Sequence, residues 1–160
     1  MKERELQSVI DQLVSVKRIE NKLGLLYEAC ASEWPEEASF FMAIQRDEDQ
    51  HEKNLEQMIQ LITRQPDRFE RGRPISPAAV NTFIAGIEKA IESLKQGQIS
   101  KEKMLYLARD YENSIIEKNY HEVVKTSDRA YTSLAALLVR ESATHKSAIE
   151  KKISELTRRP

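Results

Sequence analysis

The chain has 160 residues, which is long enough to bury a core, and we expect one domain spanning residues 1–160. Its formal net charge of -1 gives no indication of nucleic acid as the main partner, and a single cysteine excludes an internal disulfide framework. Four Gly and five Pro are few, which favours long helices. The charged N-terminus and the lack of a long apolar run predict a cytoplasmic protein without an export signal or a membrane span.

The first predicted helix covers residues 3–31, where apolar side chains recur at steps of three and four. One carboxylate, Glu20, interrupts this otherwise largely apolar face. Pro35 then fits the first turn of a second helix, where its missing N–H costs little.

The second predicted helix reaches about residue 63 and carries an E-x-x-H motif, Glu48 to His51, on its apolar face. The other members of that face, from Phe41 to Ile62, are apolar, so Glu48 and His51 should point into a core. A carboxylate or charged imidazole left alone there is costly. Both residues therefore need a partner or a bound ion.

Residues 64–74 contain two prolines, a glycine and four arginines, which predicts a loop. The arginines allow contact with an anionic partner, although a solvated loop is the favoured interpretation. Ser76 and Pro77 predict the start of a helix over residues 77–95, with Ser76 as its cap. The chain thus has a long connection that carries a helix of its own.

Ser100 should cap a further helix that reaches about residue 125 and places Glu112 on its inner side. Glu117 and His121 of that helix become rival ligands if it is rotated, although they share a side with polar residues and a solvated face is favoured.

The last predicted helix covers residues 129–156 and carries Glu141 and His145 in its apolar stripe. Residues four apart lie about 40° apart around a helix, so these two side chains can face one point.

These elements predict an all-α fold, an antiparallel four-helix bundle of two helical hairpins with the additional helix in the long connection. Trp34 marks the first turn and stands 14 residues from both Glu20 and Glu48. Ser127 marks the second turn, 15 residues after Glu112 and 14 before Glu141. Since residues equidistant from a turn lie side by side, each hairpin should bring its two carboxylates to one level.

Four carboxylates and two imidazoles at one level of a bundle core are typical of a site for two metal ions. The predicted metal ligands are Glu20, Glu48, His51, Glu112, Glu141 and His145. Oxygen and nitrogen ligands of this kind suit Fe or Mn better than soft-ligand metals. We therefore expect two Fe ions as the cofactor, with Mn or a mixed Fe/Mn pair as alternatives.

Two segments carry a family resemblance, Glu20–Tyr27 (ENKLGLLY) and Asp47–His51 (DEDQH). With Ser100 through Glu112, they make the chain similar to the ferritin-like superfamily, and within it to the small rubrerythrin-like di-iron carboxylate proteins. The resemblance covers essentially the whole chain. It implies a non-haem di-iron oxidoreductase that uses O2 or peroxide, for peroxide reduction, oxidase activity or ferrous-iron oxidation. It also implies a homodimer. The net charge and the lack of a long apolar run separately predict no nucleic acid and no membrane as partner.

Three departures from the family pattern matter. The pair Glu141 and His145 is one residue longer than E-x-x-H, and Ser142 stands where that motif has Glu. Ile115 replaces a further acid of the family. Cys30 stands alone, so the cysteine-rich rubredoxin domain of full rubrerythrins is absent and electrons would come from an external donor protein. The first two departures favour the alternative, a helical-bundle interaction or regulatory protein with a degenerate or absent metal site.

Two further interpretations stay open at this point. Tyr27 lies two turns from Glu20 on the same face, placed to hydrogen-bond a ligand or gate access, although a core tyrosine with a satisfied hydroxyl is favoured. Iron storage in a shell is disfavoured, because no obvious short fifth helix follows Leu156.

Overall fold

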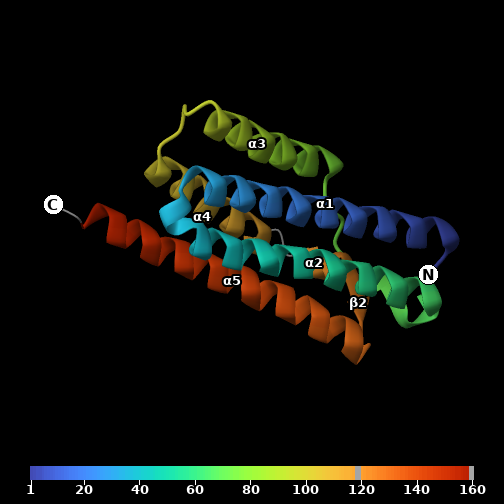
Figure 1. The fold of residues 1–160 in the computed structure, drawn as a ribbon. Helices are drawn as coiled ribbons and strands as arrows, with labels where there is room; N and C mark the ends of the chain where they lie inside the picture. The colour runs from blue at the N-terminus through green and yellow to red at the C-terminus, as the bar shows by residue number, and fades with distance from the viewer. Residues whose placement is uncertain (118–119, 159–160) are drawn as a thin grey trace.

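The computed structural model describes the backbone of residues 1–117 and 120–158, with the side chains outside 115–121. This described part is mostly helical, as predicted, and includes five α-helices (Figure 1). The α-helices are α1 (Glu3–Glu33), α2 (Ala38–Arg64), α3 (Pro77–Lys95), α4 (Lys101–Glu117) and α5 (Arg129–Thr157). Three 3-10 helices and two short strands complete it: η1 (Pro35–Glu37), η2 (Pro66–Arg68), β1 (Phe69–Arg71), η3 (Tyr120–Val123) and β2 (Val124–Thr126). None of the described helices combines the length and apolarity needed to cross a bilayer.

The predicted helix starts are confirmed by their caps. The Ser76 hydroxyl accepts a hydrogen bond from the Ala79 N–H at 3.4 Å at the start of α3. The Ser100 hydroxyl accepts one from the Lys103 N–H at 3.3 Å, at the start of α4. These bonds satisfy backbone donors that a helix leaves unpaired in its first turn. The sequence therefore gives correct starts for the two helices of the second half that follow a serine.

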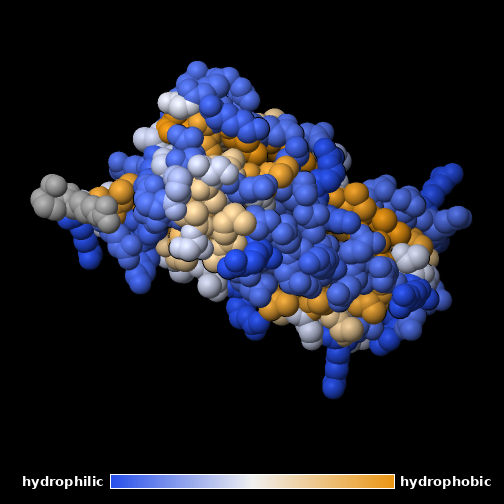
Figure 2. Space-filling view, in the orientation of Figure 1, coloured by the Kyte–Doolittle hydropathy of each residue, from blue (hydrophilic) through white to orange (hydrophobic). Residues whose placement is uncertain are grey.

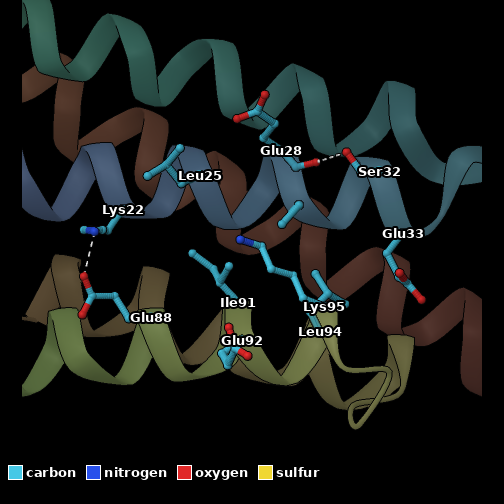
Figure 3. A pocket seen from close by; sticks show the side chains of 11 residues that line it. Lys22, Leu25, Glu28, Ser32, Glu33, Glu88, Ile91, Glu92, Leu94 and Lys95 are labelled. Carbon is cyan, nitrogen blue, oxygen red and sulfur yellow. Dashed lines mark hydrogen bonds and ion pairs between the residues drawn. The ribbon is translucent and has the colours of Figure 1, made fainter.

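The long helices lie side by side, α1 against α2 and α4 against α5, and α2 also packs on α5 (Figure 1). Helix α3 packs on the outer side of α1, where the Lys22 ammonium pairs with the Glu88 carboxylate at 2.7 Å. Figure 3 shows the groove between these two helices, with a volume of about 550 Å³ and with Leu25 and Ile91 on its walls. Leu25 is 43% exposed there. The space-filling view shows further apolar side chains at the surface among a mostly hydrophilic exterior (Figure 2).

The helix predicted to reach residue 125 is shorter, and this prediction was wrong. Helix α4 ends at Glu117, and residues 124–126 form β2, which pairs antiparallel with β1. The same pairing corrects the loop predicted for residues 64–74, because its residues 69–71 form β1. Two apolar side chains of the strands explain the change: Phe69 of β1 and Val124 of β2 are buried, and extended backbone suits phenylalanine and valine.

The two strands connect the segment between α2 and α3 with the segment between α4 and α5. Beyond the strand register, the Gly72 N–H donates to the Val123 carbonyl at 2.8 Å and the Arg73 N–H donates to the Glu122 carbonyl at 2.8 Å. The Phe69 ring packs edge-on against Tyr131 of α5, with ring centroids 5.5 Å apart. The pairing therefore fixes the segment after α2 against the segment before α5.

Candidate metal centre

Five of the six predicted ligands lie together in the interior, and each helix pair contributes. Glu20 comes from α1, Glu48 and His51 from α2, Glu112 from α4 and His145 from α5. All five side chains are buried, with Glu20, His51 and Glu112 fully so. Buried charges of this number require mutual pairing or a bound cation.

The first group consists of Glu20, Glu48 and His51. The His51 Nδ1 atom lies 3.0 Å from Glu48 Oε2 and 3.3 Å from Glu20 Oε2. One ligand atom from each residue falls within 4.8 Å of the others, which is compact enough to surround one ion. Glu20 and Glu48 thus lie at one level, as counting from the first turn predicted.

The second group consists of Glu48, Glu112 and His145. The His145 Nδ1 atom lies 3.1 Å from Glu48 Oε1 and 3.7 Å from Glu112 Oε1. These three residues meet the same 4.8 Å limit. The two oxygens of Glu48 therefore face different histidines, and this carboxylate belongs to both groups.

Glu141 lies outside both groups and contacts the far side of the His51 ring. Its Oε2 atom is 3.0 Å from His51 Nε2, and its side chain is 31% exposed. In the same way, Asp47 Oδ2 lies 3.1 Å from His145 Nε2, with 54% of the Asp47 side chain exposed. Each imidazole thus has carboxylates at both nitrogens. Glu141 was predicted as a ligand and Asp47 was not, although each of these acids precedes a histidine by four residues.

The hairpin of α4 and α5 differs in register from the prediction, because the helix does not continue from Glu112 to the turn. Counting 15 residues at the α-helical rise of ~1.5 Å placed Glu112 level with Glu141. The segment after α4 includes η3 and β2, in which the rise per residue is larger, about 2.0 and 3.3 Å. Glu112 therefore lies farther from the turn, and its neighbour on α5 is His145, one helical turn beyond Glu141.

Tyr27 forms a hydrogen bond with a predicted ligand, which is one of the two roles that the sequence left open for it. Its fully buried hydroxyl donates to Glu112 Oε1 across 2.6 Å. This bond links α1 with α4 and fixes the Glu112 carboxylate. The Tyr27 ring also stacks on Phe41, with ring centroids 6.5 Å apart.

Two buried oxygens of the site, Glu20 Oε1 and Glu112 Oε2, have no hydrogen-bond partner among the described residues. Glu48 Oε1 has only the ionic contact with His145 Nδ1, at 3.1 Å. An unsatisfied buried acceptor costs roughly 1–3 kcal/mol, and more when it is charged. These two oxygens, one in each ligand group, are what a cation would coordinate, so the residues present fit a metal pair.

The same burial changes the proton affinities of the site. Burial, with the neighbouring Glu48 charge, raises the pKa of Glu20 to about 8. Burial alone would lower the pKa of His51, but its hydrogen bonds to Glu20 and Glu48 raise that pKa to about 11. His145 has its pKa raised to about 10 in the same way, by Glu112 and Glu48 against the effect of burial. Without cations the group therefore holds protons that a metal ion would displace.

Some residues singled out in the sequence lie outside the described side chains, namely Ile115, Glu117 and His121. Ser142 is described and is buried on α5. No family model, curated protein or solved structure matches this chain. The case for a function therefore comes from the geometry of the site.

Proposed function

We propose that this protein is a ferritin-like, rubrerythrin-like di-iron carboxylate protein that reacts with O2 or peroxide, with a mixed Fe/Mn pair as the alternative cofactor. In this proposal α1, α2, α4 and α5 form the four-helix bundle, and α3 belongs to its long connection. One observation carries the proposal: two three-residue ligand groups, fully inside the protein, have the Glu48 carboxylate in common. A carboxylate that bridges two cations is the usual centre of such a site.

The ligand assignment follows the two groups. Glu20, His51 and one oxygen of Glu48 would hold the first ion, while Glu112, His145 and the other oxygen of Glu48 would hold the second. When bound, the metal pair would supply the electrons that reduce O2 or peroxide. Cys30 is buried and is the single cysteine of the given sequence, and in this proposal an external donor protein would supply the replacement electrons.

Asp47 and Glu141 orient the two imidazoles. Each carboxylate accepts a hydrogen bond from the Nε2–H of a histidine, at 3.1 Å for Asp47 on His145 and 3.0 Å for Glu141 on His51. A proton held at Nε2 leaves the Nδ1 lone pair free to face a cation. Tyr27 has a similar effect on Glu112, because its hydroxyl donates to Oε1 and limits the rotation of that carboxylate.

The direct test is the metal content of protein purified without chelators, followed by absorbance after Fe(II) and air are added. We expect two ions per chain and an absorbance change that requires both. Glu48→Ala should lose both ions, because both groups need Glu48. Glu56→Ala is the matched control, since Glu56 lies on the same helix but pairs with Lys17 at the surface, 2.8 Å away. A metal-free protein whose thermal stability ignores Fe(II), Mn(II) and Zn(II) would contradict the proposal.

A second candidate is a helical-bundle interaction or regulatory protein without a working metal site. Ser142 favours it, because a hydroxyl stands where a second bridging acid would be expected. This candidate predicts that Glu20→Ala and Glu48→Ala leave the fold intact, because no bound ion is lost with either carboxylate. If the wild-type protein binds metal and neither variant does, the result favours the di-iron proposal over this candidate.

A further inference from the structure

The site has an internal two-fold pattern with one exception. His51 of α2 corresponds to His145 of α5, and in each case an acid four residues earlier contacts the other histidine. Glu20 of α1 and Glu112 of α4 correspond in the same way, one in each ligand group. By this pattern the partner of Glu48, three residues before His51, is Ser142, three residues before His145.

Ser142 lies on the inner side of α5. It is 1% exposed, and residues three apart occupy the same face of a helix as their neighbours, here that of the buried His145. A serine hydroxyl is attached to Cβ, whereas the carboxylate of a glutamate extends two carbons farther. Ser142 therefore cannot reach across the site as Glu48 does, and the side opposite Glu48 has no bridging carboxylate in the described groups.

The charge of the ligand layer points to the same deficit. Glu20, Glu48 and Glu112 together carry three negative charges when metal has displaced their protons. Two divalent ions carry four positive charges, which leaves one uncompensated positive charge in a buried layer. Such a charge is costly away from water. Asp47 and Glu141 compensate it only weakly, since both are partly exposed and bind the outer imidazole nitrogens.

We propose that the site takes a small monocarboxylate as an exogenous ligand, beside Ser142 and opposite Glu48. This inference rests on the proposed metal pair. Two oxygens on one carbon would give the metal pair the kind of bridge that Glu48 would provide on the other side. One negative charge neutralises the layer, and the Ser142 hydroxyl donates a hydrogen bond to the bound anion. A compound with a small carboxylate group is thus the class of substrate or effector that this chain accepts.

The experiment uses protein loaded with Co(II), whose visible spectrum responds to a change of ligand. Acetate and formate are titrated into the loaded protein at constant ionic strength, with chloride as the reference anion. We expect a saturable spectral change for the wild type. Ser142→Glu should bind two Co(II) but lose the response at least tenfold, because its own carboxylate fills the position. Ser142→Ala should keep the response with an affinity reduced severalfold.

Ser147→Glu is the matched control, because Ser147 is exposed on the same helix and the substitution adds the same charge as Ser142→Glu. It should respond to acetate as the wild type does. A wild-type protein that binds two Co(II) without any response to acetate or formate overturns this inference and leaves the di-metal proposal in place. An undiminished response in folded Ser142→Glu also overturns it. If the wild type binds no Co(II), the proposed function itself fails.

Discussion

The acidic side chains around His51 and His145 form two sets, those that face the Nδ1 atom of a histidine and those that face the Nε2 atom. Asp47 and Glu141 are the outer pair, 3.1 Å and 3.0 Å from Nε2 of His145 and His51. They lie outside the two three-residue groups, and in the proposed metal-loaded site they would determine which imidazole nitrogen keeps its proton. Their contribution should appear as metal affinity and not as a change of fold.

Asp47→Asn should lower the affinity for Mn(II) or Co(II) about 10- to 100-fold, the range found when a carboxylate behind a metal-binding histidine is removed. Titration of the chelator-treated protein measures this effect. Asp49→Asn provides the control, because Asp49 is two residues away on α2 and its carboxylate accepts from the Gln45 side chain at 2.7 Å. Equal affinities for the two variants would show that Asp47 does not position His145.

Cys30 is a small buried group in the interior of α1. Its side chain is fully buried, and burial raises the pKa of the thiol to about 12. The reactive thiolate is therefore nearly absent at pH 8. We expect a thiol reagent to modify denatured protein stoichiometrically and folded protein at least a hundredfold more slowly. Rapid modification of the folded chain would mean that the α1 interior opens readily.

How far the site was predictable depends on the residue. Glu20, Glu48 and His51 lie together, as counting from the first turn predicted, because that turn is short and flanked by helix on both sides. Glu112 and His145 lie in the site, but Glu141 does not lie beside Glu112, since η3 and β2 lengthen the path from the turn. Residue spacing gives no indication of a change in rise per residue.

At the scale of elements, the short sheet is the feature that periodicity could not supply. Three-residue strands are too short for an alternating pattern, and β1 lies in a stretch whose Pro, Gly and Arg content indicates a loop. The pairing also depends on partners 53 to 57 residues later in the chain, from Arg71 with Val124 to Phe69 with Thr126. Helix α3, by contrast, has its predicted bounds because Ser76 and Pro77 mark its start locally.

Gly72 is required where the sheet ends. A Cβ atom at this position would lie 1.9 Å from the Glu122 carbonyl oxygen, a backbone atom that cannot move without breaking the pairing. Gly72→Ala should therefore destabilise the protein by about 1–3 kcal/mol, the cost typical of overpacking. Denaturant unfolding monitored by circular dichroism measures it.

Gly86→Ala is the control for that substitution. Gly86 lies inside α3, and an added Cβ would lie 3.6 Å from the Tyr111 hydroxyl, an ordinary contact. Alanine is the better helix former, so this variant should gain about 0.5–1 kcal/mol. If Gly72→Ala and Gly86→Ala lose stability equally, the close approach of Gly72 to the Glu122 carbonyl is not the cause of the loss.

At the scale of the whole molecule, proton binding and metal binding oppose each other. The folded state raises the pKa of Glu20 from 4.5 to about 8, that of His51 from 6.5 to about 11 and that of His145 from 6.5 to about 10. Folded metal-free protein thus binds more protons than unfolded protein throughout the interval from pH 6.5 to 8. Its free energy of unfolding must fall as the pH rises there.

We expect the Tm of chelator-treated protein to decrease from pH 6.5 to pH 8, while the increase in Tm caused by Mn(II) grows over the same range. The second effect arises because fewer protons compete with the ion as the pH rises. Differential scanning calorimetry with and without Mn(II) measures both slopes. A metal-free Tm that rises between these two pH values would show that the buried acids and histidines are not protonated as their contacts indicate.

Glu48 has a consequence for how the two positions fill, because it contributes one oxygen to each group. Two binding equilibria that involve the same side chain are thermodynamically linked, and the linkage is reciprocal. Whatever factor the first ion applies to the affinity of the second, the second applies to the first. At equilibrium, a protein offered two unlike ions must reach one distribution whichever is added first, and a product that depends on the order of addition would reflect kinetic trapping.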